Sequence, residues 1–365
     1  MFAANIELML GASMRLSIRL LAATAIGVAS LAPAAQAQDM TTASFGGTTI
    51  YIGGGFQYLN LPDIRFTGKG DPSNFRRQKN SDFSEYGGSA GAGIETSLGF
   101  WGNSRVTAGV KGFFSNVEGS DHTACRNQTC IVVDPTGTET GFGPPILKTK
   151  TDREADYWGG SAELKFGGGQ PVHAKPNLYR NDYFIVGADI RGIDQDNKLR
   201  GKFEGDPIFT YKETLDTTYT GGYIGVGGEY SLGFLTGGGM YDRLGLRTFI
   251  NARAGLYNAD TDYDGTFAFQ DFPFSSKLSQ SNDELAFIGT ISLETRKQLG
   301  PRTSLSLWTD YEYISSVPKM RYADGGDRPT RIDDEAIFAS RTMLRLNISF
   351  GGQPVAAPDY AEPLK

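Results

Sequence analysis

Apolar residues alternate with small, polar or charged residues in one segment of this chain after another. Within 85–98 one parity carries Tyr86, Ile94 and Leu98, and the other carries Glu85 and Glu95. Segments 105–116, 157–166 and 338–350 repeat the pattern. A period of two places apolar residues on one face of a β-strand, whereas a helix would repeat about every 3.6 residues. The pattern therefore predicts a nearly all-β protein.

About ten such segments follow one another. Each reaches the roughly 9 to 11 residues that a tilted strand needs to cross a membrane. A secreted soluble β-sandwich is the alternative, but its strands are typically about five or six residues long. The length favours a membrane barrel with strands near 48–60, 84–99, 104–117, 154–167, 182–195, 218–234, 243–260, 284–298, 302–316 and 336–350.

Short and long connections alternate between these strands. The short ones are 101–103, 167–181, 235–242 and 298–302, and the long ones are 61–83, 118–153, 196–217, 261–283 and 317–335. Outer-membrane barrels combine short periplasmic turns, long outer loops and an even strand number. We therefore expect a closed antiparallel up-and-down transmembrane β-barrel with both termini in the periplasm.

The last alternating segment carries a resemblance to a known group of proteins. Ala336 to Phe350 ends with Leu344, Leu346, Ile348 and Phe350 on one face. It resembles the aromatic-terminated last strand that the barrel-assembly machinery recognises in Gram-negative outer-membrane β-barrel proteins. The resemblance implies a barrel over 48–350 in the outer membrane, with lipid and lipopolysaccharide as neighbours. Residues 351–365 depart from it and are predicted to form a Gly- and Pro-rich periplasmic tail.

The N-terminal region has the pattern of an export signal. Arg15 and Arg19 precede an apolar stretch, 20–31, and Ala35-Gln36-Ala37 follows it. This pattern predicts a signal peptide over 1–37, with 1–13 as an upstream start artefact. Residues 38–47 would then form a short periplasmic segment.

Composition excludes two classes of protein. After Leu31 no run is long and apolar enough for a membrane helix, and the mean hydropathy is -0.31. Removing Arg15, Arg19 and Glu7 with the leader changes 35 basic and 41 acidic residues to 33 and 40, a net charge near -7. Without a basic stripe, this charge argues against nucleic-acid binding.

Parity also predicts the contents of the barrel. A ten-stranded tube is narrow, and opposite charges on its inner walls should pair because unpaired charges there lose hydration. Such a network could be only stabilising or could act as a selectivity filter. The predicted lumen residues are Glu85, Glu95, Arg105, Lys111, Glu163, Lys165, Asp189, Arg191, Glu229, Arg247, Arg253, Glu294, Arg296, Asp310, Glu312, Arg341 and Arg345.

Two loop motifs suggest further sites. Cys125 and Cys130 are the only cysteines of an exported chain, which favours a disulfide within an outer loop. Asp260, Asp262, Asp264 and Asp271, with Gly265, match the front of a calcium loop, although strands would flank it. The alternatives are a solvated acidic edge and cation-bridged contact with lipopolysaccharide phosphates. No other cofactor is expected.

The outer end is predicted to project. Segments 198–204 and 208–215 suggest one tall hairpin, and 266–269 and 275–278 suggest another. In this respect the chain resembles the ten-stranded omptin proteases, which use Asp-His and Asp pairs at the rim. The two histidines, His122 and His173, do not match that pattern, and His122 directly follows Asp121. We therefore expect no enzyme.

Three functions remain open. The first is a structural or porin-like barrel that passes small solutes through a narrow charged lumen. The second is a surface adhesion or partner-binding barrel that acts through its outer loops. The third is a rim hydrolase, which the histidine positions disfavour.

Overall fold

The computed structural model describes most of the chain between Gly47 and Gly351. The described ranges are 47–71, 74–102, 104–126, 129–136, 138–143, 146–168, 180–231, 246–270, 275–322 and 330–351. The predicted signal peptide, the 38–46 part of the predicted N-terminal segment, and tail residues 352–365 lie outside these ranges. Among the described residues, no helix is long and apolar enough to span a membrane.

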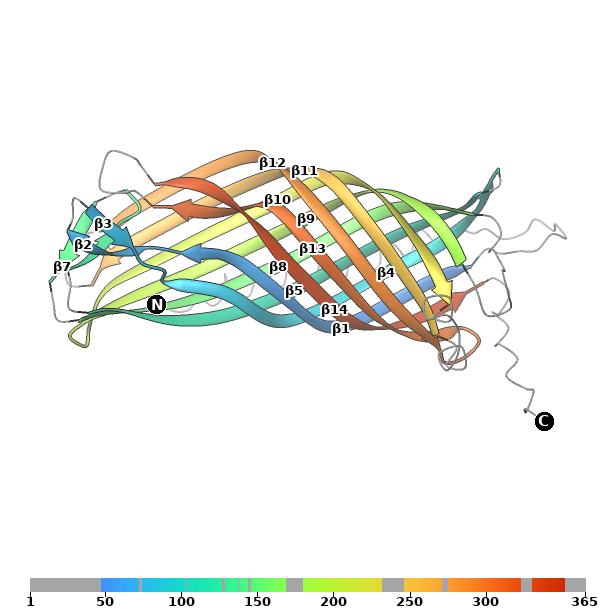
Figure 1. Cartoon of the computed structure of the whole chain (residues 1–365), viewed down its shortest axis with the longest axis horizontal. Helices are drawn as coiled ribbons and strands as arrows, with labels where there is room; N and C mark the ends of the chain where they lie inside the picture. Colours follow the sequence, from blue (N-terminus) through green and yellow to red (C-terminus); the bar gives the residue numbers. More distant parts are fainter. Residues whose placement is uncertain are drawn as a thin grey trace, which may run out of the picture.

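Ten long strands form a closed antiparallel barrel (Figure 1). Strand β1 pairs with β14 on one side and β4 on the other, which closes the ring. The ring order is β1-β14-β13-β12-β11-β10-β9-β8-β5-β4. The bounds are β1 (Thr48–Ile64), β4 (Ser81–Trp101), β5 (Ser104–Arg126), β8 (Ile146–Gly168), β9 (Arg180–Phe203), β10 (Asp206–Ser231), β11 (Leu246–Phe269), β12 (Ser275–Gln298), β13 (Thr303–Arg321) and β14 (Arg331–Phe350).

The predicted fold class and strand number are confirmed, but the strands are longer than expected. Strand β10 has 26 residues and β11 has 24, well beyond the length needed to cross a bilayer. Strands β9 and β10 continue as the predicted hairpin and turn at Glu204 and Gly205, where Gly205 has a φ of 107°. The second predicted hairpin is formed by the ends of β11 and β12.

A second, smaller sheet lies beyond the end of the barrel that carries the long loops (Figure 1). We call this end the long-loop end, and the opposite end, where β4 ends at Trp101 and β12 ends at Gln298, the short-turn end. The sheet has the order β3-β2-β6-β7. It comprises β2 (Thr67–Asp71), β3 (Asn74–Arg77), β6 (Cys130–Val133) and β7 (Glu139–Phe142). This cap sheet was not predicted and is built from the first two long loops.

Part-way along the long strands, the outward face changes from apolar to polar and the inward face changes from polar to apolar. On β11, Leu256 faces outward and is 59% exposed, whereas the outward positions farther on are occupied by Asp260 and Asp262. The inward positions change in the opposite sense, from Arg253 to buried Tyr257 and Tyr263. The barrel is therefore apolar outside near the short-turn end and apolar inside near the long-loop end.

The outward apolar side chains form a continuous band, which we call the apolar belt. Such a band is the surface that a barrel presents to lipid. Its exposed members are Ile50, Ile52, Phe56, Tyr86, Leu98, Phe100, Leu164, Phe184, Val186, Ile190, Ile224, Val226, Leu256, Leu285, Phe287, Ile291, Leu293, Leu307, Tyr311, Phe338, Leu344, Leu346, Ile348 and Phe350. We call the strand residues between this belt and the long-loop end the outer projection.

The belt can be tested with one charge at two heights on β12. Ile291 is 57% exposed within the belt, and Ser281 faces the same way in the outer projection. We expect Ile291→Arg to lower the free energy of unfolding in lipid vesicles by about 2 to 4 kcal/mol. Ser281→Arg should change it by less than about 0.5 kcal/mol. Equal effects in urea titrations would contradict the assignment of the belt.

Candidate functional site

A cavity of about 290 Å³ occupies the barrel interior near the short-turn end. It extends inward from Gly47 and Arg247 to Trp308. Polar and charged side chains predominate in its wall, with a few aromatic rings among them. Its further lining includes Thr49, Tyr51, Glu95, Ser97, Arg105, Lys111, Glu163, Lys165, Asn181, Tyr183, Glu229, Phe249, Asn251, Ser292, Glu294, Arg296 and Asn347.

Beyond this cavity, a contact joins opposite walls of the barrel. Strands β8 and β13 are five steps apart in the ring of ten, whichever way it is followed. The Tyr157 hydroxyl on β8 nevertheless donates a hydrogen bond of 2.7 Å to Glu312 on β13. Arg191 pairs with the same carboxylate at 2.7 Å and with Asp189 at 2.8 Å. These buried groups bridge the bore at belt level.

Other ion pairs extend this bridge toward both walls. Arg341 pairs with Asp310 at 3.0 Å, and its guanidinium carbon lies 3.4 Å from the centre of the Phe113 ring. Lys111 pairs with Glu163 at 2.9 Å. Burying a charge is costly unless it is paired and hydrogen-bonded, so the loss of either partner of such a pair would destabilise this interior. Additional pairs closer to the short-turn end are Lys165–Glu95, Arg296–Glu294 and Arg247–Glu229.

An apolar layer fills the interior next to the ion pairs, toward the long-loop end. The side chains of Leu59, Val117, Ile193, Ile288 and Ile314 pack together and are almost fully buried. Sequence reasoning missed this layer because it treated every inward position as lumen. The signal was present, since the outward positions beside these residues change from apolar to Asp, Glu, Asn and Thr.

A buried carboxylate with several hydrogen-bond donors lies farther out in the projection. Glu213 accepts bonds from the hydroxyls of Tyr211 at 2.5 Å and Tyr322 at 2.7 Å. It also accepts a bond of 3.2 Å from the side chain of Asn197, and Tyr263 lies 2.5 Å from the Tyr211 oxygen. Because Tyr322 belongs to the last long loop, the cluster attaches that loop to the barrel wall.

Burial raises the pKa of Glu213 above its ordinary value. The hydrogen bonds from Tyr211 and Tyr322 and the positive charge of Arg153 oppose this shift without cancelling it. Arg153 itself binds Asn197 and the Pro62 carbonyl oxygen, each at 2.9 Å. Folding therefore shifts the protonation equilibrium of Glu213 toward the neutral form, relative to the unfolded chain.

Aromatic rings and the cap sheet close the long-loop end above this cluster. Phe66 stacks on Tyr211 with ring centres 4.3 Å apart and packs against Phe209 and Phe267. The predicted disulfide between Cys125 and Cys130 is confirmed and links β5 to β6.

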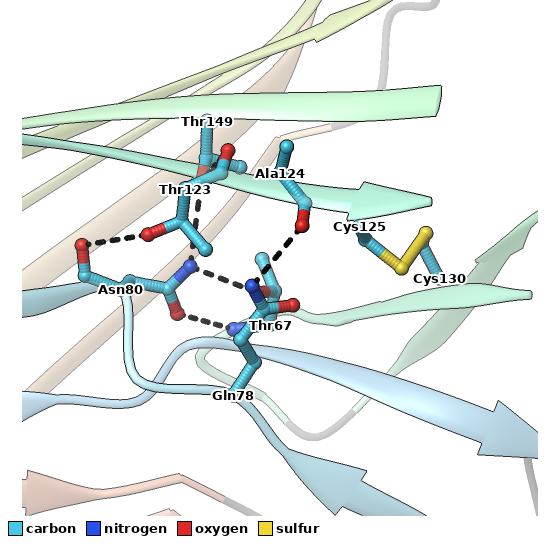
Figure 2. Close-up of a disulfide and its surroundings, with 8 residues drawn as sticks. All are labelled: Thr67, Gln78, Asn80, Thr123, Ala124, Cys125, Cys130 and Thr149. Atoms are coloured by element: carbon cyan, nitrogen blue, oxygen red, sulfur yellow. Dashed lines mark hydrogen bonds between the residues drawn. A yellow bond between two sulfur atoms is a disulfide. The ribbon is translucent and has the colours of Figure 1, made fainter. Parts of the chain in front are cut away.

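Polar contacts hold the cap segment beside the disulfide, as Figure 2 shows. Asn80 accepts a bond of 2.8 Å from the Thr67 amide and donates one of 2.8 Å to the Thr67 hydroxyl. Gln78 donates a bond of 3.4 Å to the Ala124 carbonyl oxygen. The Gln78–Ala124 bond ties the first long loop to the second, whereas the Asn80–Thr67 bonds lie within the first loop and the disulfide lies within the second.

The predicted lumen residues all fall on inward-facing positions. One group meets at the bridge: Lys111, Glu163, Asp189, Arg191, Arg253, Asp310, Glu312 and Arg341. A second group lines the cavity toward the short-turn end: Glu95, Arg105, Lys165, Glu229, Arg247, Glu294 and Arg296. Glu85 lies apart from both, beside Gly119. Arg345 stacks against Trp308 and Tyr51. Whether the network selects ions stays a prediction.

The segment expected to form a calcium loop is instead part of a strand. Asp260, Asp262 and Asp264 lie at alternate outward positions of β11, because the strand continues into the projection. Asp271 lies outside the described residues. Among the residues that the structure describes, no group of three or more His, Cys, Asp or Glu residues could hold a metal ion.

These carboxylates belong to an acidic row on the outside of the projection. Asp216 on β10 lies in register with Asp262 on β11 and Asp194 on β9. Desolvation, followed by repulsion from neighbouring carboxylates, raises the pKa of Asp216 to about 6. His122 faces outward and is exposed on β5, and His173 lies outside the described ranges.

The ion pairs of Arg191 with Glu312 and Asp189 are expected to stabilise the folded barrel. Removing the side chain of Arg191 leaves Glu312 and Asp189 buried without that partner. We expect Arg191→Ala to lower the free energy of unfolding by about 3 to 5 kcal/mol. Lys277→Ala, which removes an exposed pair with Asp264, should cost less than about 1 kcal/mol. Similar midpoints for both variants in denaturant titrations would show that the bridge is not structurally important.

The raised pKa of Glu213 predicts a pH dependence with a defined sign. Its contribution to stability is complete below the ordinary glutamate pKa, about 4.3, and is lost as the pH rises through the raised native pKa. Glu213→Gln cannot titrate in this way. As the pH rises, amides near Tyr322 should therefore become better protected from hydrogen exchange in this variant than in the wild type. Glu204→Gln, in the exposed turn, is the control. A difference that stays constant with pH would contradict the prediction.

A scan of known protein families finds no match, and a search of curated proteins also finds none. Among solved structures, the outer-membrane protease OmpT from Escherichia coli is similar at 9% identity and a TM-score of 0.42, covering 86% of this chain and 99% of its own. A Pseudomonas aeruginosa FadL homologue reaches 6% identity and a TM-score of 0.25, with coverages of 84% and 90%. An anion-selective porin from Comamonas acidovorans reaches 8% and 0.14, with coverages of 83% and 100%.

Similarities this low carry no argument about activity. The closed ring of ten strands and its apolar belt have the architecture by which β-strands cross a membrane. The chain therefore has the fold of a closed, antiparallel transmembrane β-barrel.

Proposed function

We propose that this protein is a closed outer-membrane barrel that supports a rigid projection and acts through its long loops. The contact between Tyr157 and Glu312 across the bore carries this proposal. The apolar layer beside it supports the same conclusion, because ions cross an apolar packed region only if it opens. The barrel wall then serves as an anchor and a stalk.

The long-loop end supports a role in surface contact. The disulfide and the Glu213 cluster hold the loops in place, and ordered loops lose less entropy when they bind a partner. The cap sheet ends in short strands, β3 and β7, at its two edges. A partner at the cell surface would meet this sheet and the β9–β10 hairpin.

We propose that the barrel spans the outer membrane at the level of its apolar belt. Lipid would cover the apolar belt, and lipopolysaccharide would surround the projection, where cations could bridge its phosphates to the acidic row. The barrel-assembly machinery would insert the chain. Both termini would lie in the periplasm, because β1 begins and β14 ends at the short-turn end.

Porin-like passage of small solutes is the second candidate. The cavity at the short-turn end supports it, since a solute could enter the barrel as far as Trp308. Further passage would require the Arg191–Glu312 pair to separate and the apolar layer to move. A rim hydrolase has less support, because His122 faces outward and its neighbour Asp121 instead binds Ser81 at 2.8 Å.

Single-channel recording in a planar bilayer tests the proposal. We expect correctly folded protein, verified by its heat-dependent gel mobility, to give no steady current. Arg253→Ala should be equally silent, because the Tyr157–Glu312 bridge remains. A steady current in the wild type, with an ion preference that changes in Arg253→Ala, would overturn the proposal and establish a channel lined by the charge network.

A further inference from the structure

Strand β12 has a partner strand on only one side over its outer half. It pairs with β11 over 275–297, whereas its ladder with β13 ends at Ile288. Just beyond that point, the Phe287 amide donates instead to the Ser315 hydroxyl at 2.8 Å. Among the described residues, no backbone hydrogen bond reaches 275–285 from the β13 side. This stretch is therefore an open edge of the barrel wall, which we call the β12 edge.

The structure of β13 explains where the ladder ends. The register of β13 with β14 shifts between Ile314 and Val317, which marks a bulge. The next residue, Pro318, has no amide proton to donate. Because proline in sheets is confined to edges and bulges, this part of β13 is a poor partner for β12.

Two other ladders of the ring also end early, but protein groups limit those edges. Between β4 and β5, the Asp121 carboxylate accepts bonds from the Asp82 amide at 3.0 Å and the Ser81 hydroxyl at 2.8 Å. Between β1 and β14, the free part of β1 contains Pro62, whose carbonyl oxygen accepts a bond from Arg153. Within the described structure, the β12 edge has neither a proline nor a side chain bonded to its free amides.

Every second residue of the β12 edge directs its backbone N–H and C=O groups toward the open side. These directions alternate along a strand, and the Phe287 amide points toward β13. The exposed side chains of Lys277 and Ser279 contact Asp264 on β11, away from the open side. Little side-chain bulk therefore hinders the approach of another strand. The residues with the same backbone direction as Phe287 are Ser275, Lys277, Ser279, Ser281 and Asp283.

Carboxylates flank the β12 edge on both sides. Across the seam between β12 and the outer ends of β13 and β14, Glu284 shares a hydrogen bond with the Asp334 carboxyl group. Among the described residues, Asp283, Glu284 and Asp334 form no ion pair with a Lys or Arg side chain. The seam therefore favours a positively charged ligand. On the other side, three aspartates of β11 lie in register with residues of the edge: Asp260, Asp262 and Asp264.

We propose that the β12 edge receives an extended, basic segment of a partner protein as an added strand. Main-chain hydrogen bonds to the free positions supply affinity, and Lys or Arg side chains of the segment pair with the flanking carboxylates. This inference rests on the proposed placement of the projection outside the cell and deepens that function by naming the chemistry of the partner. It requires neither the cap sheet nor a closed bore.

A second copy of this chain fits the edge less well. Strands of a membrane barrel tilt by roughly 35 to 45° from the membrane normal. Two copies in one membrane have the same orientation, so a two-fold axis along the normal would make their β12 edges cross. Strand pairing between them would then be limited to the crossing point.

Fluorescence anisotropy of a short labelled peptide of alternating Lys and Thr, titrated with the full-length protein in detergent, tests the edge. We expect saturable binding of one peptide per chain. The same peptide with every backbone amide methylated keeps its charges but has no N–H donor, and it should not bind. A peptide of alternating Glu and Thr should not bind either, because the carboxylates beside the edge repel it.

Variants of the chain separate strand addition from charge attraction. Ser281→Pro removes an amide on the open side without breaking a bond to β11, and should weaken binding about tenfold or more. Ser281→Val keeps this amide and should bind as the wild type does. Asp283→Asn should weaken binding at low salt. Glu118→Gln, an equal loss of charge on β5, five steps away in the ring, should leave it unchanged.

The proposal fails if the folded wild type does not bind the Lys–Thr peptide, or if the methylated peptide binds equally well. Equal weakening by Asp283→Asn and Glu118→Gln also contradicts it. If Ser281→Pro does not fold, the methylated peptide decides. Concentration-dependent dimers without peptide binding would assign the edge to a second copy instead. A conducting barrel contradicts the proposed function but leaves peptide binding unaffected, so the two tests can fail separately.

Discussion

Backbone hydrogen bonding within a closed ring is the constraint on which the rest of this structure depends. At the level of the apolar belt each long strand has a partner on both sides, so its backbone groups there are satisfied in lipid. Side chains are then free to differ along the same strand. On β11 the outward face changes from Leu256 to Asp260, while the inward face changes from Arg253 to Tyr257. The same strands thus present an apolar outer face at the belt and a polar outer face in the projection.

This inversion explains the order of layers inside the barrel. At belt level the inward face is polar, and its charges are buried in a narrow tube where they must pair. Arg191, Glu312 and Tyr157 satisfy that requirement across the bore. In the projection the outside is already polar, so the inside can pack like a soluble protein core. The closed bore follows from both layers, and for this reason the function proposed above lies at the long-loop end of the barrel.

Much of this could be predicted from the sequence, because parity is a local property. The strand number and the disulfide followed from alternation, spacing and cysteine count. Parity does not predict which residue on the opposite wall of the barrel pairs with a given inward side chain. Arg191 and Arg345 have the same pattern in the sequence, yet one is paired and the other is not. The cap sheet and the Glu213 cluster join loops that are far apart in the chain, so local alternation does not reveal them. Segment 260–264 was expected to be a loop, but β11 continues through it beyond the apolar belt.

Spin labels placed at each position from 250 to 266 on β11 would test the inversion most directly. In lipid vesicles, labels at even positions up to 256 should be accessible to oxygen, and labels at even positions from 260 onward should be accessible to a water-soluble nickel complex. Labels at odd positions from 257 should be shielded from both. Even positions that remain in lipid as far as 264, or odd positions there that contact water, would contradict a closed barrel with a packed outer projection.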